Sequence, residues 1–190
     1  MRLPPHSEGG LPLMQALRLR QSLREFAATP LSVQALSDVL WAAAGINREV
    51  VGGRTAPSAM NSNEIDLYVA LPSGLFEYLP PEHALELRVD SDVRRVTGYK
   101  DFVDDAALDL IYVADLPRMK LVPASQRESY ASAAAGAMAQ NVYLCCASQG
   151  LATVIRAWID RGILATAMQL LPEQQILLSQ SVGCVKAASL

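Results

Sequence analysis

The stretch SQRESYASAAAGAMAQNVYLCCAS, residues 125–148, determines how the rest of the chain must be arranged. Small and apolar residues would lie on all sides of the helix that it forms, and such a helix is buried inside a protein. Ser125 with Glu128 fits a capping box at its start, and Gly150 predicts its end. Cys145 and Cys146 are predicted to be packed core thiols, with a redox or metal role as the alternative.

The sequence on both sides of this helix predicts strands. The run IDLYVAL alternates apolar and polar residues, and ALDLIYVA is apolar nearly throughout, as in a strand covered on both faces. Strands or extended segments are predicted over residues 65–71, 75–79, 84–89, 107–114, 151–159 and 175–182. Few strands interleaved with helices indicate an α+β fold, and without repeats or linkers we expect a single domain over residues 1–190.

Shorter helices are predicted elsewhere. One covers residues 11–27 and is interrupted near its end, and a second begins at Ser32 as N-cap and ends at Gly45 in the left-handed conformation. A short helix over residues 90–97 and one that begins at Asp160 complete the set. Residues 47–63 are rich in Gly, Ser, Asn and Pro and predict a loop.

Composition excludes several functional classes. Of 190 residues 51% are hydrophobic and 18% charged, and the net charge is −3, which predicts a globular protein that binds no nucleic acid. No apolar run is long enough to cross a membrane, and no His/Cys cluster or Ser-His-Asp spacing predicts a metal site or a catalytic triad. Residues 1–10 predict an extended arm. We expect a cytoplasmic protein, with a secreted or periplasmic form whose leader has been removed as the alternative.

The segment RQSLREF, residues 20–26, carries the clearest chemical signal. Arg20, Ser22 and Arg24 place two guanidinium groups and a hydroxyl at alternating positions, and these groups bind phosphate through charge-assisted hydrogen bonds. The alternative is an ordinary solvated helix face. If the protein is an enzyme, we expect its reactive group to belong to a phosphate-bearing cofactor.

Five motifs in order resemble the nitroreductase family of FMN-dependent oxidoreductases, over about Arg18 to Lys186. They are R-x-S-x-R-x-F at 20–26, PSAMNS at 57–62, QNVYL at 140–144, GLAT at 150–153 and G-x-x-K at 183–186. The runs at 40–47 and 54–59 are similar to the compact SagB-type azoline dehydrogenases. The sequence departs from that branch at residues 60–64, and has Ala134 and Ala137 where Glu and His are common, so an azoline-oxidising role is not expected.

The resemblance implies an interlocked homodimer with a central, mostly antiparallel sheet flanked by helices and two FMN sites at the dimer interface. Phosphate would be held by Arg20, Ser22 and Lys186, and Arg24 would reach toward the ribityl chain or the ring edge. Backbone N–H groups of Arg156 and Ala157 would face flavin N5 and O4. The full set of implied cofactor-binding residues is Arg20, Gln21, Ser22, Arg24, Pro57, Ser58, Ala59, Met60, Asn61, Gln140, Val154, Ile155, Arg156, Ala157 and Lys186.

The implied activity is hydride transfer from NADH or NADPH, through the flavin, to an electron-poor small molecule such as a nitroaromatic or a quinone. No catalytic side chain is then needed, because the flavin carries the redox chemistry. A flavin-binding carrier or sensor with little turnover is the alternative, and a dimer without cofactor is a third. Gln140 and Asn141 could instead be buried polar groups satisfied by their neighbours, and the side chain of Arg156 could face either the flavin or solvent.

Overall fold

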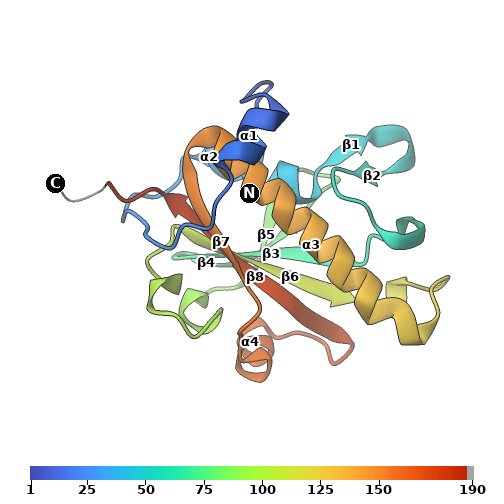
Figure 1. Ribbon diagram of the computed structural model, residues 1–190. Coiled ribbons are helices and arrows are strands. Elements are labelled where there is room, and N and C mark those ends of the chain that lie inside the picture. Colours follow the sequence, from blue (N-terminus) through green and yellow to red (C-terminus); the bar gives the residue numbers. More distant parts are fainter. Residues whose placement is uncertain (188–190) are drawn as a thin grey trace.

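The computed structural model describes residues 1–187, and its centre is an antiparallel sheet (Figure 1). Within the described residues this sheet has six strands in the order β5-β4-β3-β6-β8-β7, and every neighbouring pair is antiparallel. The strands are β3 (Ile65–Leu71), β4 (Gly74–Leu79), β5 (Ala84–Val89), β6 (Leu108–Asp115), β7 (Leu151–Arg156) and β8 (Gln174–Cys184). The predicted α+β class is confirmed, and each predicted strand exists within a few residues of its expected bounds.

The long helix α3 (Ala124–Gln149) packs against the sheet through small side chains. Ala131, Ala135, Ala139 and Cys146 on its inner face are almost fully buried, and they belong to the main core cluster. Burial raises the pKa of the neighbouring Cys145 thiol to about 12. These thiols are therefore core groups, as predicted.

The predicted capping box of α3 is wrong. The N-cap is Pro123 and no side chain caps the helix, because the helix begins one residue before Ser125 and places that residue inside the first turn. Gly150 ends the helix in the left-handed conformation with φ 69°, as predicted.

Helices cover both faces of the sheet (Figure 1). Helix α2 (Val33–Ala44) packs beside α3 over one face, and α4 (Arg161–Met168) covers the other with Leu164 and Met168. Ser32 caps α2 by accepting the Ala35 N–H at 3.1 Å, and Asp160 caps α4 by accepting the Ile163 N–H at 3.0 Å. Both predicted caps are confirmed.

Three local predictions are wrong. The first helix, α1 (Leu13–Leu19), ends before the Arg20 segment, which is extended. Gly45 has φ −64° and ψ 156°, so α2 ends in extended backbone without a left-handed residue. The predicted helix over residues 90–97, with Asp90 and Ser91 as candidate caps, is only the 3-10 turn η3 (Arg94–Val96), in which Asp92 accepts the Arg94 backbone N–H and binds its guanidinium.

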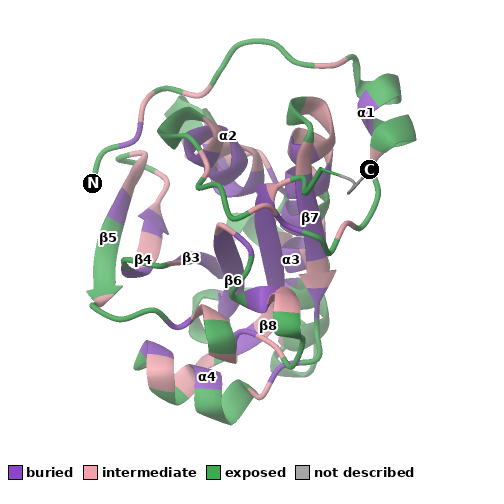
Figure 2. Cartoon of the chain, turned by 90° about the vertical axis from the view of Figure 1, so that its left-hand side faces the viewer, coloured by how far each residue is buried: buried purple, intermediate pink, exposed green. Residues whose placement is uncertain are grey.

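The first 27 residues lie along both edges of the sheet. At β5, Arg2 forms a bridge with Ala84, and the Leu85 N–H donates to the Met1 carbonyl at 2.8 Å. At the opposite end, the Leu23 N–H donates to the Thr153 carbonyl of β7 at 3.0 Å, and the Ala27 N–H donates to the Cys184 carbonyl at 3.0 Å. Figure 2 shows the buried centre between these edges and the mostly exposed α1 above it. Within residues 1–187, no helix combines the length and the hydrophobicity that a membrane crossing requires.

Candidate flavin site

Tyr143 of α3 connects two of the predicted site segments. Its hydroxyl accepts the Ile155 N–H at 3.0 Å and is hydrogen-bonded to Ser22 Oγ at 2.8 Å. The Arg20 guanidinium lies over its ring, 5.2 Å from the centroid, a cation–π arrangement. The sequence prediction gave Tyr143 no role. The sequence did contain a signal for this role, since Tyr143 lies in the mostly small and apolar second half of the helix. A tyrosine buried there needs a hydrogen-bond partner for its hydroxyl.

The predicted phosphate residues lie on the extended segment that follows α1. Arg20 is half-buried against Tyr143, whereas Gln21, Ser22 and Arg24 are exposed. Among residues 1–187, neither Arg20 nor Arg24 forms an ion pair with a carboxylate. Two guanidinium groups without counter-charges beside an exposed hydroxyl fit a phosphate group.

Lys186 comes close to this segment only through its backbone. Its N–H donates to the Glu25 carbonyl at 3.4 Å. Its side chain instead lines a hollow of about 930 Å³ together with Phe26, Arg94 and Asp104. In the described part of the chain, therefore, Lys186 is joined to the Arg20 segment by a backbone hydrogen bond, and its side chain forms no hydrogen bond or ion pair with that segment.

Strand β7 forms the edge beside this cluster, and backbone alternation decides which of its amides face outward. The Thr153 carbonyl and the Ile155 N–H both point away from β8, toward Leu23 and Tyr143. Successive residues of a strand alternate in direction, so Val154 and Arg156 direct their N–H groups toward β8. This direction is unfavourable for the predicted backbone donor at Arg156, whereas Ala157 is the first residue after the strand, where the alternation no longer applies. The exposed Ala157 N–H has no hydrogen-bond partner in the described part of the chain.

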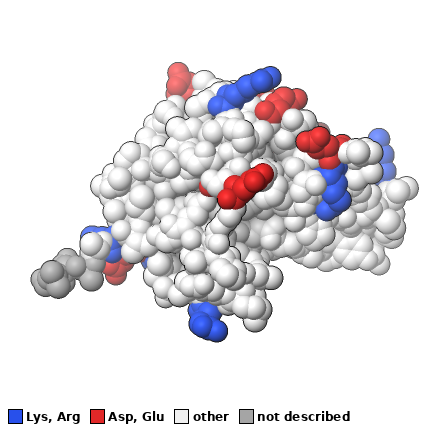
Figure 3. All heavy atoms as spheres, turned by 90° about the horizontal axis from the view of Figure 1, so that it is seen from above, with Lys and Arg blue, Asp and Glu red and all other residues white. Residues whose placement is uncertain are grey.

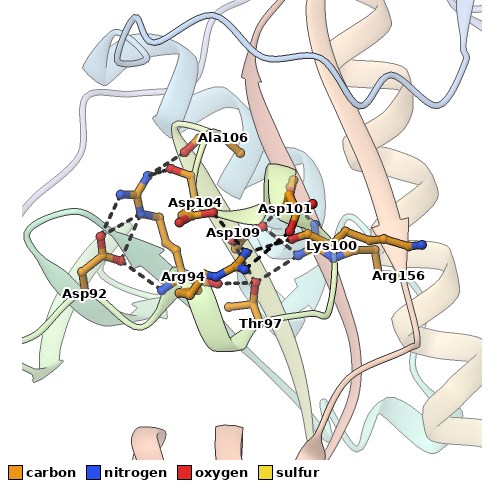
Figure 4. Close-up of polar contacts among 11 residues, drawn as sticks. Asp92, Arg94, Thr97, Lys100, Asp101, Asp104, Ala106, Asp109 and Arg156 are labelled. Carbon is orange, nitrogen blue, oxygen red and sulfur yellow. Dashed lines mark hydrogen bonds and ion pairs between the residues drawn. The ribbon is translucent and has the colours of Figure 1, made fainter.

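The Arg156 side chain faces neither solvent nor the Arg20 cluster. It is buried in an ion pair with Asp109 of β6, with Nη2 at 2.9 Å from Oδ1, and it donates to the Thr97 hydroxyl at 3.1 Å (Figure 4). Ser181 is hydrogen-bonded to both charged partners. Burial raises the pKa of Asp109, and the Arg156 charge and the two hydroxyls act against that rise. Arg156, Asp109, Thr97 and Ser181 therefore form a buried polar cluster that stabilises the end of β7.

The second predicted segment, Pro57–Asn61, is an exposed loop containing the 3-10 turn η2 (Ala59–Asn61). It follows a small hairpin of β1 (Ile46–Arg48) and β2 (Gly53–Arg54). Met60 and Asn61 both have φ 52°, a left-handed conformation that is unusual for residues with a side chain. The Asn61 amide oxygen accepts from Asn63 Nδ2 at 3.4 Å.

This loop and the Arg20 cluster contact different parts of α3. The loop encloses a small cavity with Ala134 and Met138, whereas Arg20 and Ser22 contact Tyr143. No hydrogen bond within residues 1–187 joins the two segments. Near the middle of α3, Asn141 Nδ2 donates to the Thr55 carbonyl at 3.3 Å, and Gln140 is exposed, so the expectation that both are buried is wrong for Gln140.

Comparison with known proteins identifies the family. The family model described as "Nitroreductase family" matches residues 17–184. The chain belongs to the nitroreductase family. A protein from Methanocaldococcus jannaschii, provisionally named a nitroreductase, is 32% identical over 174 residues that cover 86% of each chain.

Solved structures of other nitroreductases support this assignment. A protein from Ralstonia eutropha JMP134, provisionally described as a nitroreductase, is 50% identical with a TM-score of 0.93, over 97% of this chain and 89% of the other. The NADPH:FMN oxidoreductase from Vibrio harveyi, solved with NAD⁺, shares the fold at a TM-score of 0.68 and 16% identity, over 92% of this chain and 69% of the other. Membership in the nitroreductase family supports a general flavin-dependent oxidoreductase.

Proposed function

We propose that the chain is an FMN-dependent oxidoreductase that passes hydride from NADH or NADPH to an electron-poor small molecule. The observation that carries this proposal is the convergence at Tyr143 of Arg20, Ser22 and the outer edge of β7. Arg20 and Arg24, which pair with no carboxylate in the described chain, therefore lie near the edge strand β7, which ends just before the unpartnered N–H of Ala157.

When bound, FMN would supply reversible hydride acceptance, and the chain's residues would hold and orient it. Arg20 and Arg24 would neutralise the phosphate charge. The Tyr143 oxygen accepts from Ile155, so its own hydrogen can go to Ser22, which leaves the Ser22 hydrogen free for a phosphate oxygen. The free N–H of Ala157 would be the donor toward the ring, where it stabilises negative charge as the ring is reduced.

The proposal includes a second copy of the chain, whose Pro57–Asn61 loop would complete the site. Within one chain this loop has no contact with the Arg20 cluster, and its exposed, strained residues lack a partner in residues 1–187 that would cover them. The molecule also has a face with few charged groups that is suited to association. Leu13, Met14 and Leu17 of α1 are exposed, and the view from that side in Figure 3 shows a broad surface with few charged groups.

The decisive experiment is an absorbance spectrum of the purified protein, followed by anaerobic addition of NADH or NADPH. Flavin absorbance that bleaches and returns with a quinone or nitroaromatic acceptor is the expected result. Bound flavin that neither nucleotide reduces would contradict the proposed activity and support a carrier. Protein that takes up no FMN on reconstitution would contradict the cofactor assignment itself.

The shared site has its own test. Substitution of Leu13 and Met14 by Asp is expected to weaken association of the two copies. Flavin should be released as the two copies dissociate. Sedimentation and flavin fluorescence at the same protein concentrations measure both effects. A verified monomer that keeps FMN with unchanged affinity would contradict the contribution of a second copy.

A further inference from the structure

Glu64 is a fully buried carboxylate that the proposed chemistry leaves unused. Its Oε2 atom accepts a hydrogen bond from Ser58 Oγ at 2.5 Å. Its Oε1 atom is also buried and has no hydrogen-bond partner in the described part of the chain. This carboxyl borders a small cavity shared with Arg54 and Met138. A buried carboxyl with an unsatisfied oxygen destabilises a fold, so another effect must offset its cost.

Ser58 connects this carboxyl to the Pro57–Asn61 loop. Ser58 Oγ donates to Glu64 and accepts the Asn63 N–H at 2.8 Å, so one hydroxyl holds both ends of the turn. The Ser58 carbonyl accepts the Asn61 N–H at 3.2 Å. Ser58 Oγ already donates one hydrogen bond and accepts another inside the chain. Ser58 would therefore contact a ligand mainly through its backbone.

The residues held in this way are strained and exposed. Met60 has φ 52°, and 70% of its surface is exposed, so no packing of its side chain explains this conformation. Left-handed backbone is unfavourable for residues with a Cβ atom, and it persists where the surrounding contacts enforce it. Two sets of side-chain contacts enforce the loop: the Ser62 hydroxyl donates to the Ala59 carbonyl at 2.7 Å, and the Glu64–Ser58–Asn63 hydrogen-bond chain anchors the loop to the buried interior.

We propose that Glu64 is a positioning residue, which acts through Ser58 to keep residues 58–63 in the conformation that receives a flat ligand. The identity of that ligand, an FMN ring bound mainly by the neighbouring copy, rests on the proposed function. Preorganisation lowers the entropic cost of binding, because the loop does not have to be ordered when the ligand arrives. Glu64 is therefore needed for affinity, although it does not touch the ligand.

The test is a double-mutant cycle on FMN affinity with the full chain. Ser58→Ala and Glu64→Leu are each expected to weaken FMN binding about tenfold, the scale of one hydrogen bond to a charged group. The double variant should bind no more weakly than either single variant, because both remove the same connection. Glu64→Gln keeps an acceptor for Ser58 and should restore affinity to within about threefold of wild type. Wild-type affinity in Glu64→Leu, or additive losses in the double variant, would overturn the proposal.

A matched control separates positioning from general loss of stability. Ser37 is a buried hydroxyl that donates to the Pro4 carbonyl, far along the chain from the loop. Ser37→Ala should lower the free energy of unfolding and leave FMN affinity unchanged. If Glu64→Leu does not fold, Ser58→Ala still tests the proposal, since it retains the carboxyl.

Amide hydrogen exchange makes the test independent of the cofactor. Ser58→Ala and Glu64→Leu, measured without FMN, both remove the Glu64–Ser58 hydrogen bond, whereas Glu64→Gln keeps an acceptor for Ser58. Faster exchange at Asn61 and Asn63 in Ser58→Ala and Glu64→Leu, with little change in Glu64→Gln, is expected. If this occurs in a protein that binds no FMN, the positioning role stands and the flavin assignment fails. If FMN binds equally to all variants and exchange is unchanged, the positioning role fails and the flavin assignment stands.

Discussion

The Arg156 guanidinium and the Asp109 carboxylate form an ion pair, 2.9 Å apart, in which Arg156 is 6% exposed and Asp109 is fully buried. Removing one partner of such a pair leaves an uncompensated buried charge. We therefore expect Arg156→Met to lower the free energy of unfolding by about 3–5 kcal/mol, measured by urea denaturation. The double variant Arg156→Met with Asp109→Leu should be more stable than Arg156→Met alone.

An exposed ion pair provides the control for that prediction. Arg88 contacts Glu77 and Glu86 on the surface, with 41% of its side chain exposed. Arg88→Ala should cost less than about 1 kcal/mol because solvent screens the charges. Equal losses for Arg88→Ala and Arg156→Met would contradict the role of burial.

Arg20 is expected to contribute directly to FMN affinity. Arg20→Ala should weaken FMN binding by about 1.5–3 kcal/mol, the scale of a charge-assisted hydrogen bond, as measured by flavin titration. Arg18 lies two residues earlier on α1, is exposed and makes no ion pair in the described chain, so Arg18→Ala is the matched control. An unchanged titration for Arg20→Ala would contradict the phosphate assignment.

Tyr143 is expected to contribute both to the fold and to the site through its hydroxyl. Tyr143→Phe leaves the Ile155 N–H without an acceptor, which should cost about 1–3 kcal/mol of unfolding free energy. It also frees the Ser22 side chain, so FMN should dissociate faster in stopped-flow measurements. Tyr130→Phe, at an exposed position of the same helix, should change neither quantity.

His83 is expected to make stability depend on pH. Burial lowers its pKa, and the neutral ring accepts from the Tyr78 hydroxyl and bonds the Pro4 carbonyl at 3.0 Å. The unfolded chain binds this proton more readily, so the contribution of His83 is fully present above its unfolded pKa of about 6.5 and decreases as pH falls through the lower folded pKa.

His83→Asn tests this pH dependence, because Asn tolerates the φ of 45° found at this position. Urea denaturation of both proteins from neutral to mildly acidic pH should show a steeper loss in the wild type. Parallel curves for wild type and variant would show that His83 does not contribute.

The sequence was sufficient to predict the sheet and the long helix, because their signals are local. The predominantly apolar runs of β3 and β6, which are buried on both faces, and the small residues of α3 leave few other ways to bury apolar surface. Helix boundaries were less predictable where a side chain had two possible partners. Asp92 contacts both the backbone N–H and the guanidinium of Arg94 within one 3-10 turn, and the sequence alone did not distinguish this turn from the predicted helix over residues 90–97.

The flavin site remains a prediction, and the structure adds geometry that the sequence did not contain. The Arg20 segment lies beside β7, and the outward direction of the Ile155 N–H and the Thr153 carbonyl is set by their contacts with Tyr143 and Leu23. The same holds for Arg156, whose partner Asp109 lies 47 residues away. A buried charge that pairs across strands leaves no local pattern, so Asp109 was not recognised. Glu64 was not recognised either, because its burial comes from the fold around the loop and its partner Ser58 gives no distinctive sequence signal.

The two stretches of chain that lie along β5 and β7 also have a consequence for solubility. An uncovered edge strand presents unpaired N–H and C=O groups on which another polypeptide can add a strand. Residues 1–3 occupy one such edge and residues 23–27 the other. The segment that carries Arg20 and Ser22 therefore also shields the sheet from intermolecular strand addition. Loss of either stretch would expose a template for aggregation at its own end of the sheet.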